Sequence, residues 1–396
     1  MVELEAFRHE LRAWIAEHAP KSLYGTRRGR FDGYWGGQKA RPEPDVQRWF
    51  DAALARGWTA PSWPKAFGGG GLSHVQARAL DEELARVGLP PPLVGVGLTM
   101  IGPTLLDFGS AAQQHEHLAR IVRGEVRWCQ GYSEPGAGSD LASLSTRALR
   151  DGDHFVVNGQ KIWTTYADQS DWIFALVRTN PQAKKQLGIT FLLIDMNTPG
   201  VSTRPIELIS GASPFCETFF DDVRVPVANV VGEIDAGWTV AKALLGYERS
   251  MIGEAMSGEL ADAETELVKR ARSALAAASG VLPDDALRLA IAKLGMEERC
   301  FALTIERLRQ GAKEGQAPGS ESSILKVVAS ELKQARWELA MRVAGADALG
   351  WGGPGFDPAD LKATREWLRS RANTIEGGSS EIQLNIIAKH VLGLGA

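Results

Sequence analysis

The chain has few cysteines: Cys129, Cys216 and Cys300 are the only three among 396 residues. They lie far apart and match neither the spacing of a metal site nor the density of a disulfide-stapled fold. A chain with so few thiols and no pairing pattern suits a reducing compartment. We therefore expect a cytoplasmic protein without a metal centre.

An excess of positive charge is also missing. Lys and Arg number 44 against 48 for Asp and Glu, which gives a formal net charge of −4. Nucleic-acid-binding chains usually show a clustered basic excess. We therefore expect no nucleic-acid partner.

Long apolar runs are absent as well. No stretch approaches the roughly 18 residues that a membrane-spanning helix requires, so we expect no integral membrane association. Residues 1–18 have the pattern of an amphipathic helix with acidic residues, not that of a signal peptide. With 44% apolar and 23% charged residues, the composition is that of a globular chain long enough for two or three domains.

The pattern along the chain changes twice. Residues 1–123 are mostly helical, residues 124–235 hold short β-rich runs, and residues 236–396 are helical again. Within the middle part, Asn158-Gly159 stands between two such runs and predicts a tight hairpin. The sequence therefore predicts an α+β architecture with an N-terminal helical domain, a middle β domain and a C-terminal helical bundle.

A glycine-rich stretch precedes that hairpin, at residues 128–140. Gly136 and Gly138 allow a positive φ and the close approach of a ligand. Successive backbone N–H groups in such a turn can bind an anion or a polar edge, and Ser133 and Ser139 add hydroxyl groups. A glycine-rich loop alone is more often a structural turn, so its meaning depends on its neighbours.

Several blocks resemble the acyl-CoA dehydrogenase family. The glycine-rich stretch resembles the family's first signature, although Tyr132 stands where an aliphatic residue is usual; the matching residues are Gly131, Ser133, Glu134, Ala137, Gly138, Ser139, Asp140 and Ser143. Residues 158–165, Asn-Gly-Gln-Lys-Ile-Trp-Thr-Thr, resemble its second block. Further blocks at residues 63–69, 219–226 and 377–383 extend the resemblance through nearly the whole chain.

The resemblance implies a fold and an activity. The fold would combine an N-terminal helical domain (1–123), a middle β-barrel or sandwich (124–235) and a C-terminal four-helix bundle (236–396). The activity would be FAD-dependent oxidation of an acyl-CoA to the trans-2-enoyl-CoA, as in fatty acid β-oxidation. Electrons would pass to an electron-transfer flavoprotein, and the chain would form a homo- or hetero-oligomer, a dimer or a tetramer.

The resemblance also implies site residues. In the family, the Trp of the second block and the second residue after it lie against the flavin ring, which implies Trp163 and Thr165 here. The residues expected to contact FAD are Gln130, Tyr132, Ser133, Gly138, Ser139, Trp163, Thr164, Thr165, Ser379 and Glu381. The residues expected to contact the substrate are Ser139, Tyr247, Arg249 and Gly377.

The reaction needs a carboxylate base for the α-proton, and Glu248 is the first candidate. It lies in a helical pattern over residues 236–258 and interrupts an apolar stripe. Its neighbours three and four residues away are Leu244, Leu245, Met251 and Ile252. Because none of them can form a local ion pair, the pattern indicates either a functional carboxylate or one with a partner on another helix.

Glu376, in the C-terminal motif, is the alternative base. The usual base position of the family falls on Gly377, one residue later. The subgroup with Gly there has its base in the earlier helix, as a Glu followed by Arg, which Glu248-Arg249 matches. We therefore expect Glu248 to be the base. In the same motif, Ser380 and Gln383 have the spacing of a capping box, and this helix start could equally be a plain cap or contact the cofactor.

Two family motifs are missing. The Arg near a Phe-Gly pair and the Gln before a Gly-Gly pair, which a partner subunit supplies to FAD, are not found in residues 260–293 or 350–354. Either FAD is held differently or a second, related subunit donates these groups, and the chain is most similar to the large subunit of pimeloyl-CoA-type dehydrogenases. The alternative functions are a non-catalytic subunit that completes a partner's flavin site, and a desulfinase or oxidase on the same scaffold.

Overall fold

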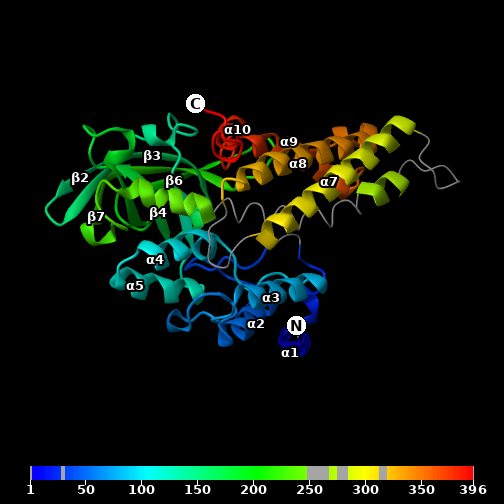
Figure 1. Ribbon diagram of the computed structural model, residues 1–396, viewed down its shortest axis with the longest axis horizontal. Coiled ribbons are helices and arrows are strands. Elements are labelled where there is room, and N and C mark those ends of the chain that lie inside the picture. Colours follow the sequence, from blue (N-terminus) through cyan, green and yellow to red (C-terminus); the bar gives the residue numbers. More distant parts are fainter. Residues whose placement is uncertain (1, 28–31, 248–266, 274–283, 312–318, 396) are drawn as a thin grey trace. The chain divides into compact units, whose positions relative to one another are not determined.

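The computed structural model describes residues 2–27, 32–247, 267–273, 284–311 and 319–395 (Figure 1). It divides into two compact units. Unit 1 comprises Met1–Ile206 and Pro214–Tyr247, and unit 2 comprises Glu207–Ser213 and Glu248–Ala396. Unit 1 holds both the N-terminal helices and the β-sheet, so the domain boundaries expected after residues 123 and 235 stay a proposal.

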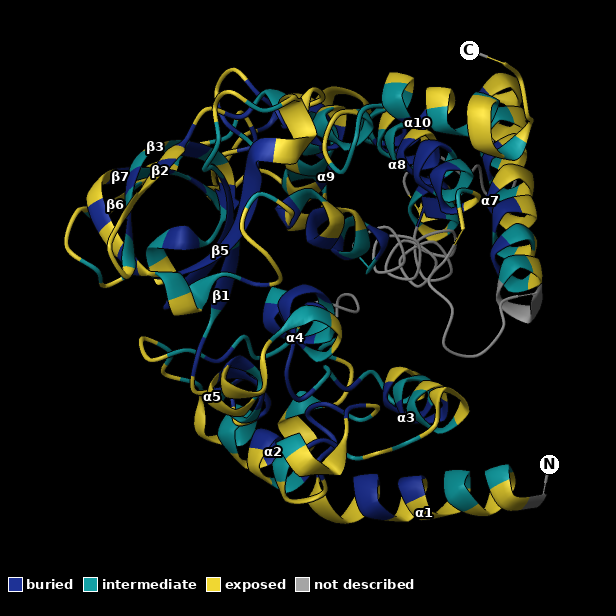
Figure 2. Cartoon of the chain, turned by 60° about the vertical axis from the view of Figure 1, so that its left-hand side comes forward, coloured by how far each residue is buried: buried dark blue, intermediate teal, exposed yellow. Residues whose placement is uncertain are grey.

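The N-terminal part of unit 1 is helical, as predicted. Its helices are α1 (Val2–His18), α2 (Pro44–Ala55), α3 (His74–Arg86), α4 (Gly102–Phe108) and α5 (Ala111–Val122). Buried and exposed residues alternate along α1 with helical spacing (Figure 2), and Leu11, Trp14 and Ile15 form its buried face. The Trp14 ring packs on Trp49 and Trp58, with ring centroids 5.0 and 4.6 Å apart.

Two of these helices begin with a serine that caps the N-terminus. Ser73 before α3 and Ser110 before α5 each accept a hydrogen bond from the backbone N–H three residues later. The Gln at that third position bonds back to the backbone of the Ser, which completes a capping box at each helix. A buried carboxylate, Glu83, ties α3 to α1 through ion pairs with Arg8 and Arg12.

The middle part is a seven-stranded, mostly antiparallel sheet with strand order β1-β4-β2-β3-β7-β6, in which β5 also pairs with β4. The strands are β1 (Trp128–Gly131), β2 (Arg147–Asp151), β3 (His154–Thr165), β4 (Trp172–Arg178), β5 (Ile189–Asp195), β6 (Val201–Ile206) and β7 (Phe215–Pro226). β4 and β5 are near-continuous apolar runs buried on both faces. The predicted helix–sheet–helix order of the fold is confirmed (Figure 1).

The hairpin predicted at Asn158-Gly159 is wrong. β3 runs through these residues, and the chain turns instead between β2 and β3. Gly159 has a φ of +149° and lies at a shift in the β3–β7 register. A Cβ at this position would stand 2.7 Å from the Cα of Thr146, so the glycine is needed for a bulge and a close backbone approach.

Unit 2 is helical. Its described helices include α7 (Asp285–Gly311), α8 (Ser322–Ala344), α9 (Pro358–Ser370) and α10 (Ser380–Ile386). α8 packs against α7, α9 and α10, and its buried side of Leu332, Leu339 and Val343 belongs to one apolar core with Leu294 and Phe301 of α7. In the part of the chain that the structure describes, no helix has the length and apolar character needed to cross a bilayer.

Candidate functional site

Trp163 near the end of β3 combines an exposed aromatic side chain with a strained backbone. The register between β3 and β7 shifts between Lys161 and Thr164, and Trp163 stands in this bulge with a φ of +61°. Its indole is 53% exposed and touches Phe215 edge-on, with ring centroids 6.1 Å apart. A bulky residue at positive φ is strained, and such strain is concentrated at functional sites. The bulge therefore leaves a large flat apolar ring exposed.

The two residues after Trp163 differ in burial. Thr164 is fully buried, and its hydroxyl finds no hydrogen-bond partner among the described residues. Thr165 is half-buried at the last position of β3. A buried hydroxyl without a partner costs free energy unless water or a ligand satisfies it. The end of β3 therefore combines an exposed ring with one buried hydroxyl that lacks a partner.

The glycine-rich loop is anchored at its start. Glu134 and Ala137 exchange two backbone hydrogen bonds of 3.0 Å across Pro135-Gly136. Neither Gly136 nor Gly138 adopts the positive φ that glycine allows. A Cβ at either glycine would meet nothing within 4 Å, so these residues leave open space. Gly138 and Ser139 are exposed, as a ligand contact requires.

A buried ion pair joins this loop to β3. Lys161 Nζ lies 2.7 Å from Glu134 Oε1 and 3.2 Å from the carbonyl oxygen of Tyr132. The Glu134 carboxylate also accepts hydrogen bonds from the backbone N–H groups of Ser145 and Thr146. Burial alone would raise the pKa of Glu134, but Lys161 and these donors hold that pKa well below its usual range. Burial lowers the pKa of Lys161, while Glu134 opposes the shift.

A backbone bond beside this pair reaches the Trp163 bulge. The N–H of Ile162 donates to the carbonyl of Ser133 at 2.9 Å. The structure thus brings the first residues of the loop against the end of β3. The sequence pattern did not reveal the Glu134–Lys161 pair, because its partners lie 27 residues apart.

Other expected flavin contacts lie nearby on β1. Gln130 is half-buried on β1 and Ser133 is half-buried just after it. The Tyr132 ring instead packs into the sheet core, edge-on to Phe174 and Phe191 at 6.1 and 6.3 Å. A tyrosine at this aliphatic position of the family pattern is therefore accommodated by core packing.

The C-terminal motif lies in unit 2. Glu376 accepts hydrogen bonds from Arg369 at 2.7 Å and from Asn373 at 2.5 Å. Gly377 and Gly378 both have positive φ, and a Cβ on Gly378 would stand 2.5 Å from Nε2 of Gln383. The positive φ and the close approach of Gln383 therefore require glycine at this turn.

The cap of the following helix differs from the expectation. Ser379, not Ser380, is the N-cap of α10, and it accepts a bond from the N–H of Ile382. Gln383 donates its amide to the carbonyl of Gly377 at 3.0 Å, so the predicted Ser380–Gln383 capping box is wrong. Glu381 is exposed in the first turn of α10, where backbone and Ser379 donors lower its pKa.

The expected substrate-side residues are only partly described. Tyr247 donates a hydrogen bond from its hydroxyl to Asp107 in α4. Glu248 and Arg249, the predicted base and its neighbour, lie outside the described residues.

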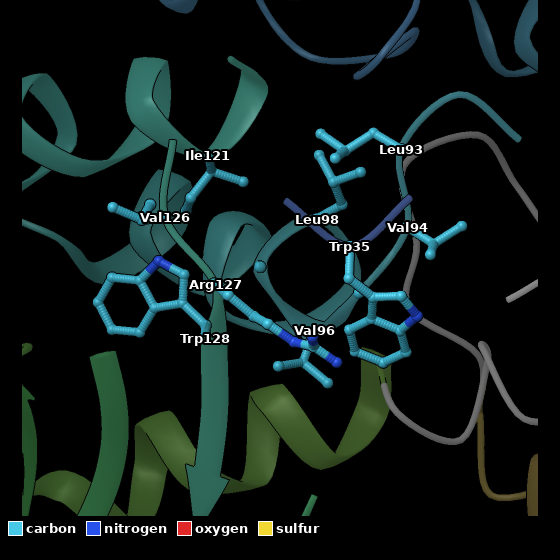
Figure 3. Close-up of a pocket in the computed structure, with 11 residues that line it drawn as sticks. Trp35, Leu93, Val94, Val96, Leu98, Ile121, Val126, Arg127 and Trp128 are labelled. Atoms are coloured by element: carbon cyan, nitrogen blue, oxygen red, sulfur yellow. The ribbon is translucent and has the colours of Figure 1, made fainter. Parts of the chain in front are cut away.

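A small hollow lies elsewhere in unit 1. Figure 3 shows it between Trp35, residues 94–98, Arg127 and Trp128. The Arg127 guanidinium lies 4.7 Å from the ring centroids of both Trp35 and Tyr166, and these two rings meet edge-on, 5.5 Å apart. None of the predicted site residues lines this hollow. Through these contacts Arg127 joins the loop before α2 to the turn after β3.

Comparison with known proteins gives consistent matches. The chain matches the N-terminal domain model of acyl-CoA dehydrogenases over residues 2–125, the middle domain model over 129–223 and the C-terminal domain model over 235–392. It is 38% identical to acyl-CoA dehydrogenase IpdE1 of Mycobacterium tuberculosis, over 100% of this chain and 98% of that protein.

Solved structures agree. The Tcur3481-Tcur3483 steroid ACAD superposes with a TM-score of 0.80 at 30% identity, covering 100% of this chain and 98% of that one. The ChsE4-ChsE5 complex from Mycobacterium tuberculosis gives a TM-score of 0.76 at 29% identity, with the same coverage.

Proposed function

The chain belongs to the acyl-CoA dehydrogenase family of FAD-dependent oxidoreductases, and from this we propose that it oxidises a bulky, steroid-type acyl-CoA to the trans-2-enoyl-CoA. Acyl-CoA dehydrogenation itself follows from the family. The choice of substrate is supported by the steroid ACAD, which covers the whole chain at 30% identity. An unbranched fatty acyl-CoA is the competing substrate class.

The residues of unit 1 fit FAD. When bound, FAD supplies the acceptor for the hydride that leaves the β carbon. Trp163 offers an exposed ring that can cover one face of a flat heterocycle, and the strained bulge keeps it there. The half-buried Thr165 and the open loop at Gly138 and Ser139 offer polar contacts. The strained, exposed Trp163 is the single observation that carries this part of the proposal.

We propose Glu248 as the base that removes the α-proton. The hydrogen bonds of the alternative base support this choice: the Glu376 carboxylate accepts from Arg369 and Asn373, which hold it within its own loop. Glu248 stands in an apolar stripe without a local ion-pair partner in the sequence. A carboxylate in such surroundings has the raised proton affinity that a base for a weak C–H acid needs.

The proposed assembly is a hetero-oligomer that reduces an electron-transfer flavoprotein. Two observations support a mixed assembly: both solved relatives are named as pairs of chains, and the partner-supplied FAD motifs are missing from this sequence. The missing motifs also favour the second candidate, a subunit that completes a partner's flavin site.

Anaerobic titration of the purified protein with a panel of acyl-CoAs tests the proposal through the visible absorbance of the flavin. We expect bleaching with a steroid-side-chain acyl-CoA at lower concentration than with an unbranched one. The bleached flavin should be reoxidised by an electron-transfer flavoprotein and only slowly by dioxygen. Two results together would instead support a subunit that completes a partner's flavin site. The protein would hold no flavin until a related subunit is added, and its Glu248→Gln variant would then remain fully active.

A further inference from the structure

Lys326 of α8 places a positive charge in the interior of unit 2. Only 4% of the residue is exposed, and its Nζ atom has no hydrogen-bond partner among the described residues. Buried ammonium groups are normally paired, because an uncompensated charge is costly to take out of water. A buried ionisable group that the fold leaves unpaired is therefore a candidate for a functional role.

The side of α8 that carries Lys326 faces the chain that leads into the C-terminal motif, residues 376–383. Lys326, Ser330 and Gln334 follow one another at intervals of four residues and form one row along the helix. Gln334 donates its amide to the carbonyl oxygen of Ser370 (3.1 Å) and to the hydroxyl of Thr374 (3.2 Å). The chain then enters the motif, and α10, which begins there, also packs against α8.

Two carboxylates flank the glycine turn of this motif. Glu376 precedes Gly377-Gly378, and Glu381 follows the turn in the first turn of α10. Burial lowers the pKa of Lys326, while Glu376 and Glu381 act in the opposite direction. In return, Lys326 adds to the backbone and Ser379 donors that lower the pKa of Glu381. The buried ammonium group is therefore attracted by a carboxylate on either side of the turn.

Stability of the fold does not explain a lysine at this position. Because burial outweighs the attraction of Glu376 and Glu381, the charge on Lys326 costs the folded state free energy. A methionine, which is of similar length and uncharged, would suit the interior better. The benefit of the charge lies in the motif: the turn brings two negative groups toward each other, and a cation beside them offsets their repulsion.

We propose that Lys326 is a positioning residue for FAD binding: by attracting Glu376 and Glu381, it holds the glycine turn and the start of α10 in the arrangement in which Ser379 and Glu381 contact the cofactor. This role rests on the proposed function and on those two expected contacts. Lys326 itself, buried beneath the motif, acts through Glu381 and does not touch FAD.

Lys326→Met tests this role in whatever assembly the protein purifies. We expect the FAD-free variant to unfold at the same or a higher denaturant concentration than the unaltered protein, because an unpaired buried charge is removed. FAD binding, measured by equilibrium dialysis, should nevertheless weaken by at least about threefold. A lysine with a purely structural role predicts the opposite for stability, with earlier unfolding of the FAD-free protein.

A double-variant cycle tests whether the effect passes through Glu381. FAD binding to Lys326→Met/Glu381→Gln should weaken by less than the product of the two single losses, because the charge has then lost one of its partners. Lys362→Met, at an exposed lysine of α9, is the matched control and should change neither stability nor FAD binding.

Three results would overturn the positioning role of Lys326. They are a loss of FAD affinity below about threefold in Lys326→Met, earlier unfolding of the FAD-free variant, and a double variant whose loss equals the product of the single losses. If the unaltered protein binds no FAD in any assembly, the proposed function itself fails, and that outcome differs from the other three.

Discussion

At the residue scale, Trp163 combines conformational strain with exposure. A non-glycine residue at positive φ costs on the order of 1–3 kcal/mol, and an exposed indole gains little from the fold in return. A ligand ring that stacks on it would supply about 0.5–1.5 kcal/mol beyond burial of area. We therefore expect this side chain to serve binding, at a cost to the stability of the FAD-free fold.

Trp163→Gly should separate the two effects. Glycine adopts positive φ freely, so we expect the FAD-free protein to unfold at the same or a higher denaturant concentration. FAD binding should weaken by about threefold to tenfold, measured by equilibrium dialysis. Leu149→Gly on β2 is the matched control, because this exposed strand residue has an ordinary φ and should only lose stability. A Trp163→Gly protein that binds FAD as tightly as the original would show that the indole does not contact the flavin.

At the scale of elements, the Glu134–Lys161 pair holds the glycine-rich loop on β3. Removing the lysine with Lys161→Met leaves a buried carboxylate without its cation, and we expect a loss of about 3–5 kcal/mol in the free energy of unfolding at neutral pH. Glu134→Gln/Lys161→Met should recover part of this loss.

The pH dependence of the same variants has a defined sign. In the unaltered protein the pKa of Glu134 is depressed when folded, so its contribution is full above the unfolded pKa of about 4.3 and is lost as the pH falls below it. In Lys161→Met we expect burial to dominate and to raise the pKa of Glu134. The difference in free energy of unfolding between the unaltered protein and this variant should therefore shrink as the pH is lowered from about 7 to 5. Denaturant titrations at both pH values measure this, and a constant difference between the two proteins would contradict the pairing.

Element order was predictable from sequence, and several local details were not. The change from helical to β-rich and back to helical patterns identified the order of the three parts, which the structure confirms. The Asn158-Gly159 hairpin failed because the same dipeptide also serves a bulge, and only the position of Thr146 across the sheet decides between them. The bonds of Glu134 and Tyr247 span 27 and 140 residues, a separation at which sequence pattern carries no signal.

At the scale of the whole molecule, one helix carries an apolar stripe on its outer side. Leu289, Met296 and Leu303 recur every seven residues along α7 and are 71%, 69% and 54% exposed. They lie opposite the buried side of that helix, where Leu294 and Phe301 join the core of unit 2. An exposed heptad stripe suits contact with another chain.

Met296→Lys should therefore weaken assembly. We expect sedimentation to show a smaller species, or a related subunit to copurify less well, with the helical content unchanged. Glu297→Ala, which lies about 100° around the same helix from Met296, is the control and should leave the assembly intact. An unchanged assembly in Met296→Lys would place the subunit contact elsewhere.

The finer likeness to pimeloyl-CoA-type large subunits, the hetero-oligomer and the expected FAD contacts of Ser379 and Glu381 stay predictions. The missing partner-supplied motifs favour a mixed assembly, because a related subunit would then supply the groups that contact FAD. Copurification of a fully flavinated protein made of this chain alone would contradict it.

The central claim is tested most directly by single-turnover reduction of the flavin with an acyl-CoA that bleaches the unaltered protein. The rate of reduction is compared between Glu248→Gln and Glu376→Gln. We predict that Glu248→Gln retains FAD and loses reduction by at least about a hundredfold, since a general base contributes 10²–10⁴-fold. Glu376→Gln should remain within about tenfold of the original, because it loses only a loop contact. The opposite pattern, with Glu376→Gln inactive and Glu248→Gln active, would contradict the account.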